Sequence, residues 1–156
     1  MTPMARYNQD ISQKLVSIDG SQKQVAEAFD VLYERLMLAD LDGKRVFNFF
    51  RNWVGANSNV RGIYLWGGVG RGKTYLMDLF YECLPFSEKQ RIHFHRFMLS
   101  IHEELERLQG VRNPLDRIAA RIAEKTKILC VDEFFVLDIG DAMLLSGILE
   151  GLLTRG

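Results

Sequence analysis

This sequence of 156 residues has few cysteines (2), few prolines (3) and a formal net charge of zero. Cys83 falls in a predicted helix and Cys130 in a predicted core strand, which excludes a disulfide framework and favours a reduced, cytoplasmic setting. Twenty basic residues balance twenty acidic ones, so no global field draws the chain to nucleic acid or acidic lipid. No stretch approaches the roughly 18 apolar residues of a membrane span, and no signal-peptide core is visible, so we expect neither a transmembrane segment nor export. The 47% hydrophobic and 26% charged residues are typical of a soluble globular protein.

A glycine-rich stretch is the most informative feature that is present. Residues 67–74 read Gly-Gly-Val-Gly-Arg-Gly-Lys-Thr and directly follow the apolar run 63–66. Several backbone N–H groups can converge on a phosphate only where Cβ atoms do not clash, and Gly67, Gly70 and Gly72 meet that need. An ordinary glycine-rich turn is the alternative, but it does not require a strand before the loop and Lys-Thr after it. The stretch therefore predicts a phosphate-binding loop that holds a nucleoside triphosphate.

The two residues that end this loop carry the predicted chemistry. We expect Lys73 to reach the β- and γ-phosphates of the nucleoside triphosphate and to stabilise charge during hydrolysis. The hydroxyl of Thr74 is expected to bind Mg²⁺. The full predicted nucleotide-binding set is Gly67, Gly68, Val69, Gly70, Arg71, Gly72, Lys73, Thr74 and Tyr75.

A second motif places two carboxylates at the end of an apolar run. Residues 128–131 read Ile-Leu-Cys-Val and are followed by Asp132 and Glu133. Such a run bounded by charge suits a central parallel strand that is covered on both faces. Alone it would fit a strand that ends in solvated acids. After a phosphate-binding loop, it predicts that Asp132 binds Mg²⁺ and that Glu133 polarises the attacking water.

Helices and strands are expected to alternate after residue 60, which predicts an α/β fold with a parallel sheet and flanking helices. We divide the chain into an N-terminal helical segment with its linker, residues 1–58, and a nucleotide-binding region, residues 59–156. The expected elements are helices at 21–40 and 44–54, a linker at 55–59, a strand at 61–66, a helix at 73–84, a strand at 91–96, helices at 97–109 and 115–125, a strand at 128–133 and a helix at 141–154.

Local signals mark several helix ends. Ser21 and Gln24 have the spacing of a capping box, and residues 40–43 predict the stop of the first helix. Asn113 before Pro114 predicts an N-cap followed by proline at the first helical position.

Smaller signals are predicted to be structural rather than catalytic. His93 and His95 would share one face of a strand, but no third ligand accompanies them, so local pairing is favoured over a metal site. Trp66 is expected to pack below the loop. Phe134 and Phe135 are expected to join the core, and a nucleotide-sensing or partner-binding aromatic element is the alternative.

Three stretches, 64–74, 93–98 and 132–143, resemble the ZapE-type division of the AAA+ ATPases, a bacterial cell-division family with mitochondrial relatives. The resemblance implies an AAA+-like P-loop NTPase fold and ATP hydrolysis coupled to the remodelling of a partner protein. It also implies a ring of identical subunits. The implied partner is the tubulin-like division ring at the inner membrane in the bacterial branch, and protein quality control in the mitochondrial branch.

Members of this family are much longer, and their second half holds the sensor, the arginine finger and the lid. The resemblance therefore predicts that the chain is an N-terminal fragment with a truncated sheet. A fragment of this kind is expected to hydrolyse ATP barely, since loss of an arginine finger alone costs about 10³- to 10⁵-fold in rate.

Two other functions share these motifs. A helicase-loader-type ATPase would need a basic groove for single strands, against which zero net charge argues. A nucleotide-gated interaction module would use the N-terminal helices as its docking surface. A phosphotransferase would need an acceptor pocket and a lid, of which the sequence gives no sign.

Overall fold

The computed structural model describes residues 1–45 and 60–155. The chain divides into two compact units, Met1–Pro85 and Phe86–Gly156, and each is described by itself. In the part of the chain that is described, no helix combines the length and apolar character needed to cross a membrane.

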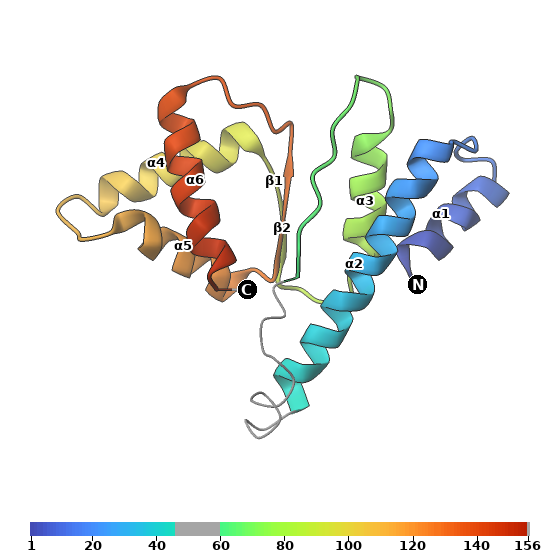
Figure 1. Cartoon of the computed structure of the whole chain (residues 1–156), viewed down its shortest axis with the longest axis horizontal. Helices are drawn as coiled ribbons and strands as arrows, with labels where there is room; N and C mark the ends of the chain where they lie inside the picture. The colour runs from blue at the N-terminus through green and yellow to red at the C-terminus, as the bar shows by residue number, and fades with distance from the viewer. Residues whose placement is uncertain (46–59, 156) are drawn as a thin grey trace. The chain divides into compact units, whose positions relative to one another are not determined.

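The first unit is built from three helices, α1 (Pro3–Ser12), α2 (Gly20–Arg45) and α3 (Lys73–Cys83), and each contacts the other two (Figure 1). Apolar side chains fill the space between them because each helix turns one face inward. The rings of Phe29 on α2 and Phe80 on α3 stack with centroids 4.6 Å apart. The buried apolar side chains of the three helices are Tyr7, Ala26, Phe29, Leu32, Leu76, Leu79 and Phe80.

The start and the end of α2 both differ from the prediction. Asp19, rather than Ser21, caps the helix, because its Oδ1 accepts hydrogen bonds from the backbone N–H groups of Ser21 (2.8 Å) and Gln22 (3.0 Å). The predicted stop at 40–43 is also wrong, since the helix continues to Arg45. The rest of the helix predicted at 44–54 and the linker predicted at 55–59 lie outside the described residues.

The strand predicted at 61–66 does not form: these residues precede α3 without strand structure and are drawn without an arrow in Figure 1. A strand exists only through its ladder partner, and within the described ranges this segment has none. Its apolar side chains are correspondingly exposed, with Tyr64 at 67% and Trp66 at 84%. The prediction that Trp66 packs below the loop is therefore wrong.

The second unit alternates strands and helices. Its elements are β1 (Lys89–His93), α4 (Phe94–Arg107), α5 (Pro114–Lys125), β2 (Ile128–Asp132) and α6 (Ile139–Leu153). The two strands pair in parallel, with Lys89 opposite Ile128 and His93 opposite Asp132. The predicted parallel pairing is thus confirmed for these two strands, and Figure 1 shows the three helices on one side of them.

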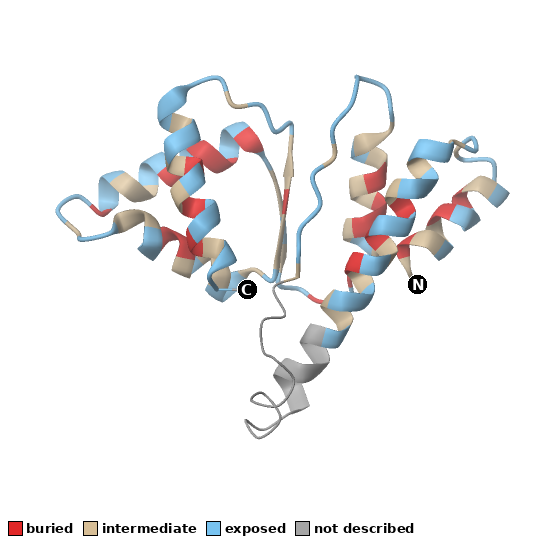
Figure 2. Ribbon diagram, viewed as in Figure 1, coloured by how far each residue is buried: buried red, intermediate tan, exposed pale blue. Residues whose placement is uncertain are grey.

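A second hydrophobic core joins the helices and strands of this unit, and Figure 2 shows the buried positions between α4, α5 and α6. Helix α6 approaches α5 closely because it presents glycine there. A Cβ atom at Gly147 would lie 2.7 Å from Leu115, and one at Gly151 would lie 2.6 Å from Ala119. The buried members of the core are Phe94, Phe97, Met98, Ile101, Leu108, Ile118, Leu145 and Ile148.

Three further predictions in this unit need correction. The strand predicted at 91–96 ends at His93, and α4 begins at Phe94, so His95 lies in a helix and does not share a strand face with His93. The prediction of a central strand covered on both faces is wrong for β2. Only its Cys130 is buried, because among the described residues β2 pairs with one strand, β1. The rings of Phe134 and Phe94 have centroids 5.0 Å apart, but Phe134 is 36% exposed and Phe135 is 71% exposed, so the prediction that they join the core is wrong.

Candidate functional site

The glycine-rich loop has the backbone that its composition predicts. Gly67, Gly70 and Gly72 have φ angles of 141°, 78° and 78°, a region that L side chains rarely adopt. At Gly67 and Gly70 a Cβ atom would meet nothing within 4 Å, so conformation rather than crowding requires glycine there. Val69 stands fully exposed at the tip of the loop. The loop therefore has, at its glycines, the left-handed backbone angles that anion-binding loops use.

The lysine at the end of the loop folds back over it. Lys73 Nζ donates hydrogen bonds to the carbonyl oxygens of Gly67 (2.8 Å) and Gly68 (2.7 Å). Helix α3 begins at the same residue, and no described side chain caps its N-terminus. The N–H groups of the first turn and the positive end of the helix dipole thus face the loop, beside the exposed Thr74. An ammonium and a helix N-terminus without a side-chain cap are groups that phosphate-binding sites use.

Tyr75, which belongs to the predicted nucleotide-binding set, ties α3 to α1. Its hydroxyl donates a hydrogen bond of 2.8 Å to Oδ2 of Asp10, a carboxylate that is itself buried. Arg6 Nε donates to the other oxygen of Asp10 at 3.1 Å. Burial and the Asp10 carboxylate together raise the pKa of the Tyr75 phenol well above its ordinary value of 10.0.

Replacing Tyr75 with phenylalanine is expected to lower the free energy of unfolding by about 1–3 kcal/mol, because Asp10 stays buried with one donor fewer. Since the raised pKa belongs to the folded state, the hydroxyl contributes fully below pH 10.0 and its contribution is lost as the pH rises further. Urea unfolding at neutral and alkaline pH measures both effects. The control is Tyr33→Phe, which removes a hydroxyl from α2. An equal loss in both variants would contradict a specific role for the Asp10 bond.

In the second unit, Asp132 ends β2 and is held by an arginine. Its side chain is 16% exposed, and its Oδ2 accepts a hydrogen bond of 3.0 Å from Nη2 of Arg91 on the paired strand. Its Oδ1 accepts the backbone N–H of Glu133 at 3.0 Å. Both carboxylate oxygens are thus held in place, one by β1 and one by the backbone that follows the strand.

Glu133 lies outside the strand that the sequence predicts for it. Its φ of 51° places it in the left-handed region, which costs a residue with a side chain about 1–3 kcal/mol. The side chain is 79% exposed, and Oε2 lies 3.9 Å from Nδ1 of His93. A strained, exposed carboxylate directly after a fixed one is a feature that packing alone does not explain.

A family model for AFG1-like ATPases matches residues 1–156, the whole of the chain. The chain belongs to the AFG1-like ATPase family. The resemblance to the ZapE-type division is confirmed by the same match and by the relatives described next.

Several curated relatives of this AFG1-like chain are similar over most or all of its length. The cell division protein ZapE of Escherichia coli strain K12 is 44% identical over 165 residues, which cover 100% of this chain and 44% of ZapE. Lactation elevated protein 1 homolog B of Danio rerio is 41% identical over 62% of the chain and 21% of its own length. An uncharacterized protein of Schizosaccharomyces pombe, C115.02c, is 48% identical over 62% of the chain and 22% of its own length. No solved structure is significantly similar to the chain.

Sequence reasoning missed three residues around the sites of this AFG1-like ATPase chain. Arg91 holds Asp132, Asp10 holds Tyr75, and Gln22 contacts the loop by donating from Nε2 to the carbonyl oxygen of Arg71 at 3.3 Å. Each contact joins residues at least 41 positions apart, so no local pattern marks it. The sequence predicts a parallel sheet without a strand order, so nothing in it indicates that Arg91, opposite Cys130 in the middle of β1, would reach Asp132.

Proposed function

We propose that the chain binds ATP with Mg²⁺ and hydrolyses it, with residues 67–75 as the nucleotide-binding segment. The observation that carries the proposal is the loop itself, in which three glycines with positive φ lead into a helix N-terminus and the Lys73 ammonium binds two carbonyl oxygens of the loop. Membership of the AFG1-like ATPase family supports the same activity.

In this proposal Thr74 and Asp132 would hold Mg²⁺, which would supply positive charge beside the phosphates, and Lys73 stabilises the charge that develops on the γ-phosphate. Glu133 orients the water that attacks the γ-phosphate. The fixed Asp132 and the exposed Glu133 support this division of roles, because a metal partner must be held still and a water-orienting group must reach solvent. The arrangement proposed is an AAA+-like P-loop domain over residues 59–156, preceded by the helical segment 1–58.

We further propose that hydrolysis remodels a partner protein during cell division, since the similar E. coli protein is named a cell division protein. A tubulin-like division protein, a homo-oligomeric ring and a cytoplasmic place beside the inner membrane belong to the same proposal. The chain spans 44% of the length of ZapE, so these properties are carried over from a longer relative.

Magnesium dependence tests the proposal directly. ATP with Mg²⁺ is expected to raise the melting temperature more than ATP with a chelator does, by about 2–4 °C per kcal/mol of added binding energy. Thr74→Ala is expected to lose the magnesium-dependent part, because it removes the hydroxyl ligand, and the matched variant Thr74→Ser is expected to keep it. Differential scanning fluorimetry measures the melting temperatures of the unaltered chain and of the two variants. A chain that ATP does not stabilise at all would contradict the proposed function, and equal shifts with and without Mg²⁺ would remove the metal from it.

A further inference from the structure

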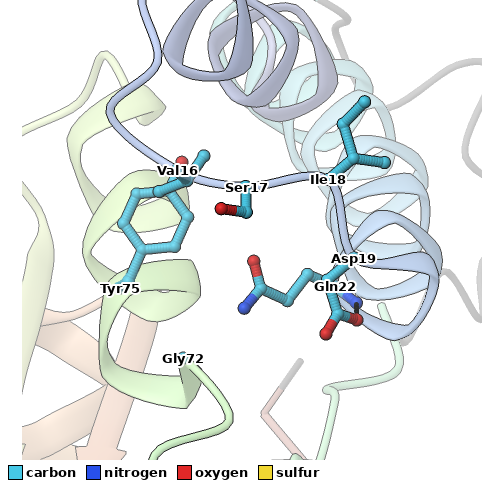
Figure 3. A pocket seen from close by; sticks show the side chains of 7 residues that line it. All are labelled: Val16, Ser17, Ile18, Asp19, Gln22, Gly72 and Tyr75. Atoms are coloured by element: carbon cyan, nitrogen blue, oxygen red, sulfur yellow. Dashed lines mark hydrogen bonds between the residues drawn. The ribbon is translucent and has the colours of Figure 1, made fainter.

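A pocket of about 280 Å³ opens in the first unit beside the glycine-rich loop. Figure 3 shows it between the turn that joins α1 to α2 and the first turn of α3. It is smaller than the roughly 300–1,000 Å³ of a typical small-molecule site, so it suits one part of a ligand that is anchored elsewhere. The residues that line it are Val16, Ser17, Ile18, Asp19, Gln22, Gly72 and Tyr75.

The pocket is continuous with the phosphate-binding loop because two of its lining residues belong to both. Gly72 ends the loop, and Tyr75 lies in the first turn of α3. A nucleotide whose phosphates are held by residues 67–74 therefore has this pocket within reach of its other end. The aliphatic side chains of Val16 and Ile18 and the Tyr75 ring supply apolar surface of the kind that the faces of a purine require.

One polar group in the pocket lacks a partner. Oε1 of Gln22 is buried and makes no hydrogen bond with any described residue. The orientation of the amide is fixed by its other end, since Nε2 donates to the Arg71 carbonyl at 3.3 Å. Figure 3 shows the oxygen turned toward Ser17 and the nitrogen turned toward Gly72. A buried acceptor without a donor is costly, so a ligand that brings an N–H group here is favoured.

Glycine at position 72 is what permits this arrangement. A Cβ atom on Gly72 would lie 2.6 Å from Nε2 of Gln22, closer than real side chains approach. The positive φ of Gly72 also excludes a side chain. Gly72 and Gln22 thus fit one another across 50 positions of sequence, and the Asp19 side chain, which accepts a hydrogen bond from the Gln22 backbone N–H, holds the first turn of α2 in place beside them.

We propose that Gln22 selects adenine over guanine at this pocket, an inference that rests on the proposed binding of a nucleotide by residues 67–75. Adenine presents an amino donor beside a ring-nitrogen acceptor, and a glutamine amide pairs with both atoms. Guanine presents a carbonyl oxygen in place of the amino group, which would face the Gln22 acceptor. The pocket therefore favours the base that satisfies Oε1 and disfavours the base that opposes it.

Isothermal titration of the chain with ADP, GDP, the diphosphate of purine riboside and inorganic pyrophosphate tests this assignment. ADP is expected to bind roughly 10- to 100-fold more tightly than GDP or the purine nucleotide without the amino group. Gln22→Leu is expected to weaken ADP by the same factor and to bring the ADP-to-GDP ratio close to one, while pyrophosphate titrated into the same variant measures separately what the lost hydrogen bond to the Arg71 carbonyl costs the loop. Gln24→Leu, on the exposed face of the same helix, is the matched control and is expected to change none of the four.

The outcomes separate this inference from the function on which it rests. If pyrophosphate binds but ADP and GDP bind equally well to the unaltered chain, the selective role of Gln22 is wrong and the phosphate site stands. If ADP is preferred and Gln22→Leu keeps that preference, another group recognises the base and the role assigned to Gln22 is wrong. If neither nucleotides nor pyrophosphate bind, both proposals are contradicted. The comparison of ADP with the diphosphate of purine riboside needs no variant of the protein, so the assignment can be tested even where Gln22→Leu fails to fold.

Discussion

Lys73→Ala is expected to weaken ATP binding roughly 10- to 100-fold. The rate of hydrolysis is expected to fall by a further 10²- to 10³-fold, about the effect of removing one charged donor from a reacting oxyanion. The Lys73 ammonium already reaches the inside of the loop, where it binds the carbonyl oxygens of Gly67 and Gly68 at 2.8 and 2.7 Å. A phosphate oxygen carries more negative charge than a carbonyl oxygen, so it competes for the same donor. Equilibrium titration with a slowly hydrolysed ATP analogue measures the binding term.

Lys23→Ala is the control, since it removes an equal charge from α2 in the same unit, where Lys23 pairs at the surface with Glu27. This variant is expected to bind ATP as the unaltered chain does. Lys73→Ala has a second consequence for the loop, because two backbone carbonyls lose their donor, so circular dichroism must accompany the titration. A folded Lys73→Ala chain that keeps full affinity for ATP would show that the loop does not hold the phosphates.

Glu133→Gln is expected to lower ATP hydrolysis by about 10²- to 10⁴-fold while affinity for ATP changes little. The amide keeps the size of the side chain and the backbone at φ 51°, but it cannot accept a proton from the attacking water. Single-turnover hydrolysis of γ-labelled ATP with protein in excess is the suitable measurement, because it detects the chemical step even where turnover is slow. The same samples give the binding affinity, which separates a chemical effect from a binding effect.

Glu106→Gln makes the identical change at an exposed position of α4 and serves as the reference. It is expected to hydrolyse ATP at the unaltered rate. Hydrolysis that continues unchanged in Glu133→Gln would remove this residue from the reaction. A joint loss of binding and hydrolysis would assign it a structural role, for which its strained backbone supplies the reason.

The parts of the structure that local chemistry dictates were predictable. Positive φ at Gly67 and Gly72 follows from the spacing of the loop, and α3 ends at Cys83 before Pro85, which cannot continue a helix. Pro114 opens α5 as the Asn113-Pro114 pair predicts, although the Asn113 side chain makes no capping bond. In each case a single residue type restricts the backbone whatever surrounds it.

The parts that depend on a distant partner were not predictable. The segment 61–66 has the composition of a strand, yet an apolar run cannot specify the ladder that a strand needs. Phe94 opens α4 directly after β1 without a capping side chain, so no local signal marks that boundary. The site contacts of Arg91 and Gln22 are likewise tertiary, and they connect residues 41 and 49 positions apart.

The short connection between β2 and α6 is anchored at both ends. The strand ladder fixes Asp132 on one side, and on the other the Asp138 side chain accepts hydrogen bonds from the N–H groups of Gly140 and Asp141. Because α6 is wedged against α5 through Gly151, it cannot slide to follow a shift of this connection. Residues 133–137 therefore join two fixed ends, and because Phe134 lies against the Phe94 ring and Val136 packs against the core, Glu133 is carried on a restrained connection.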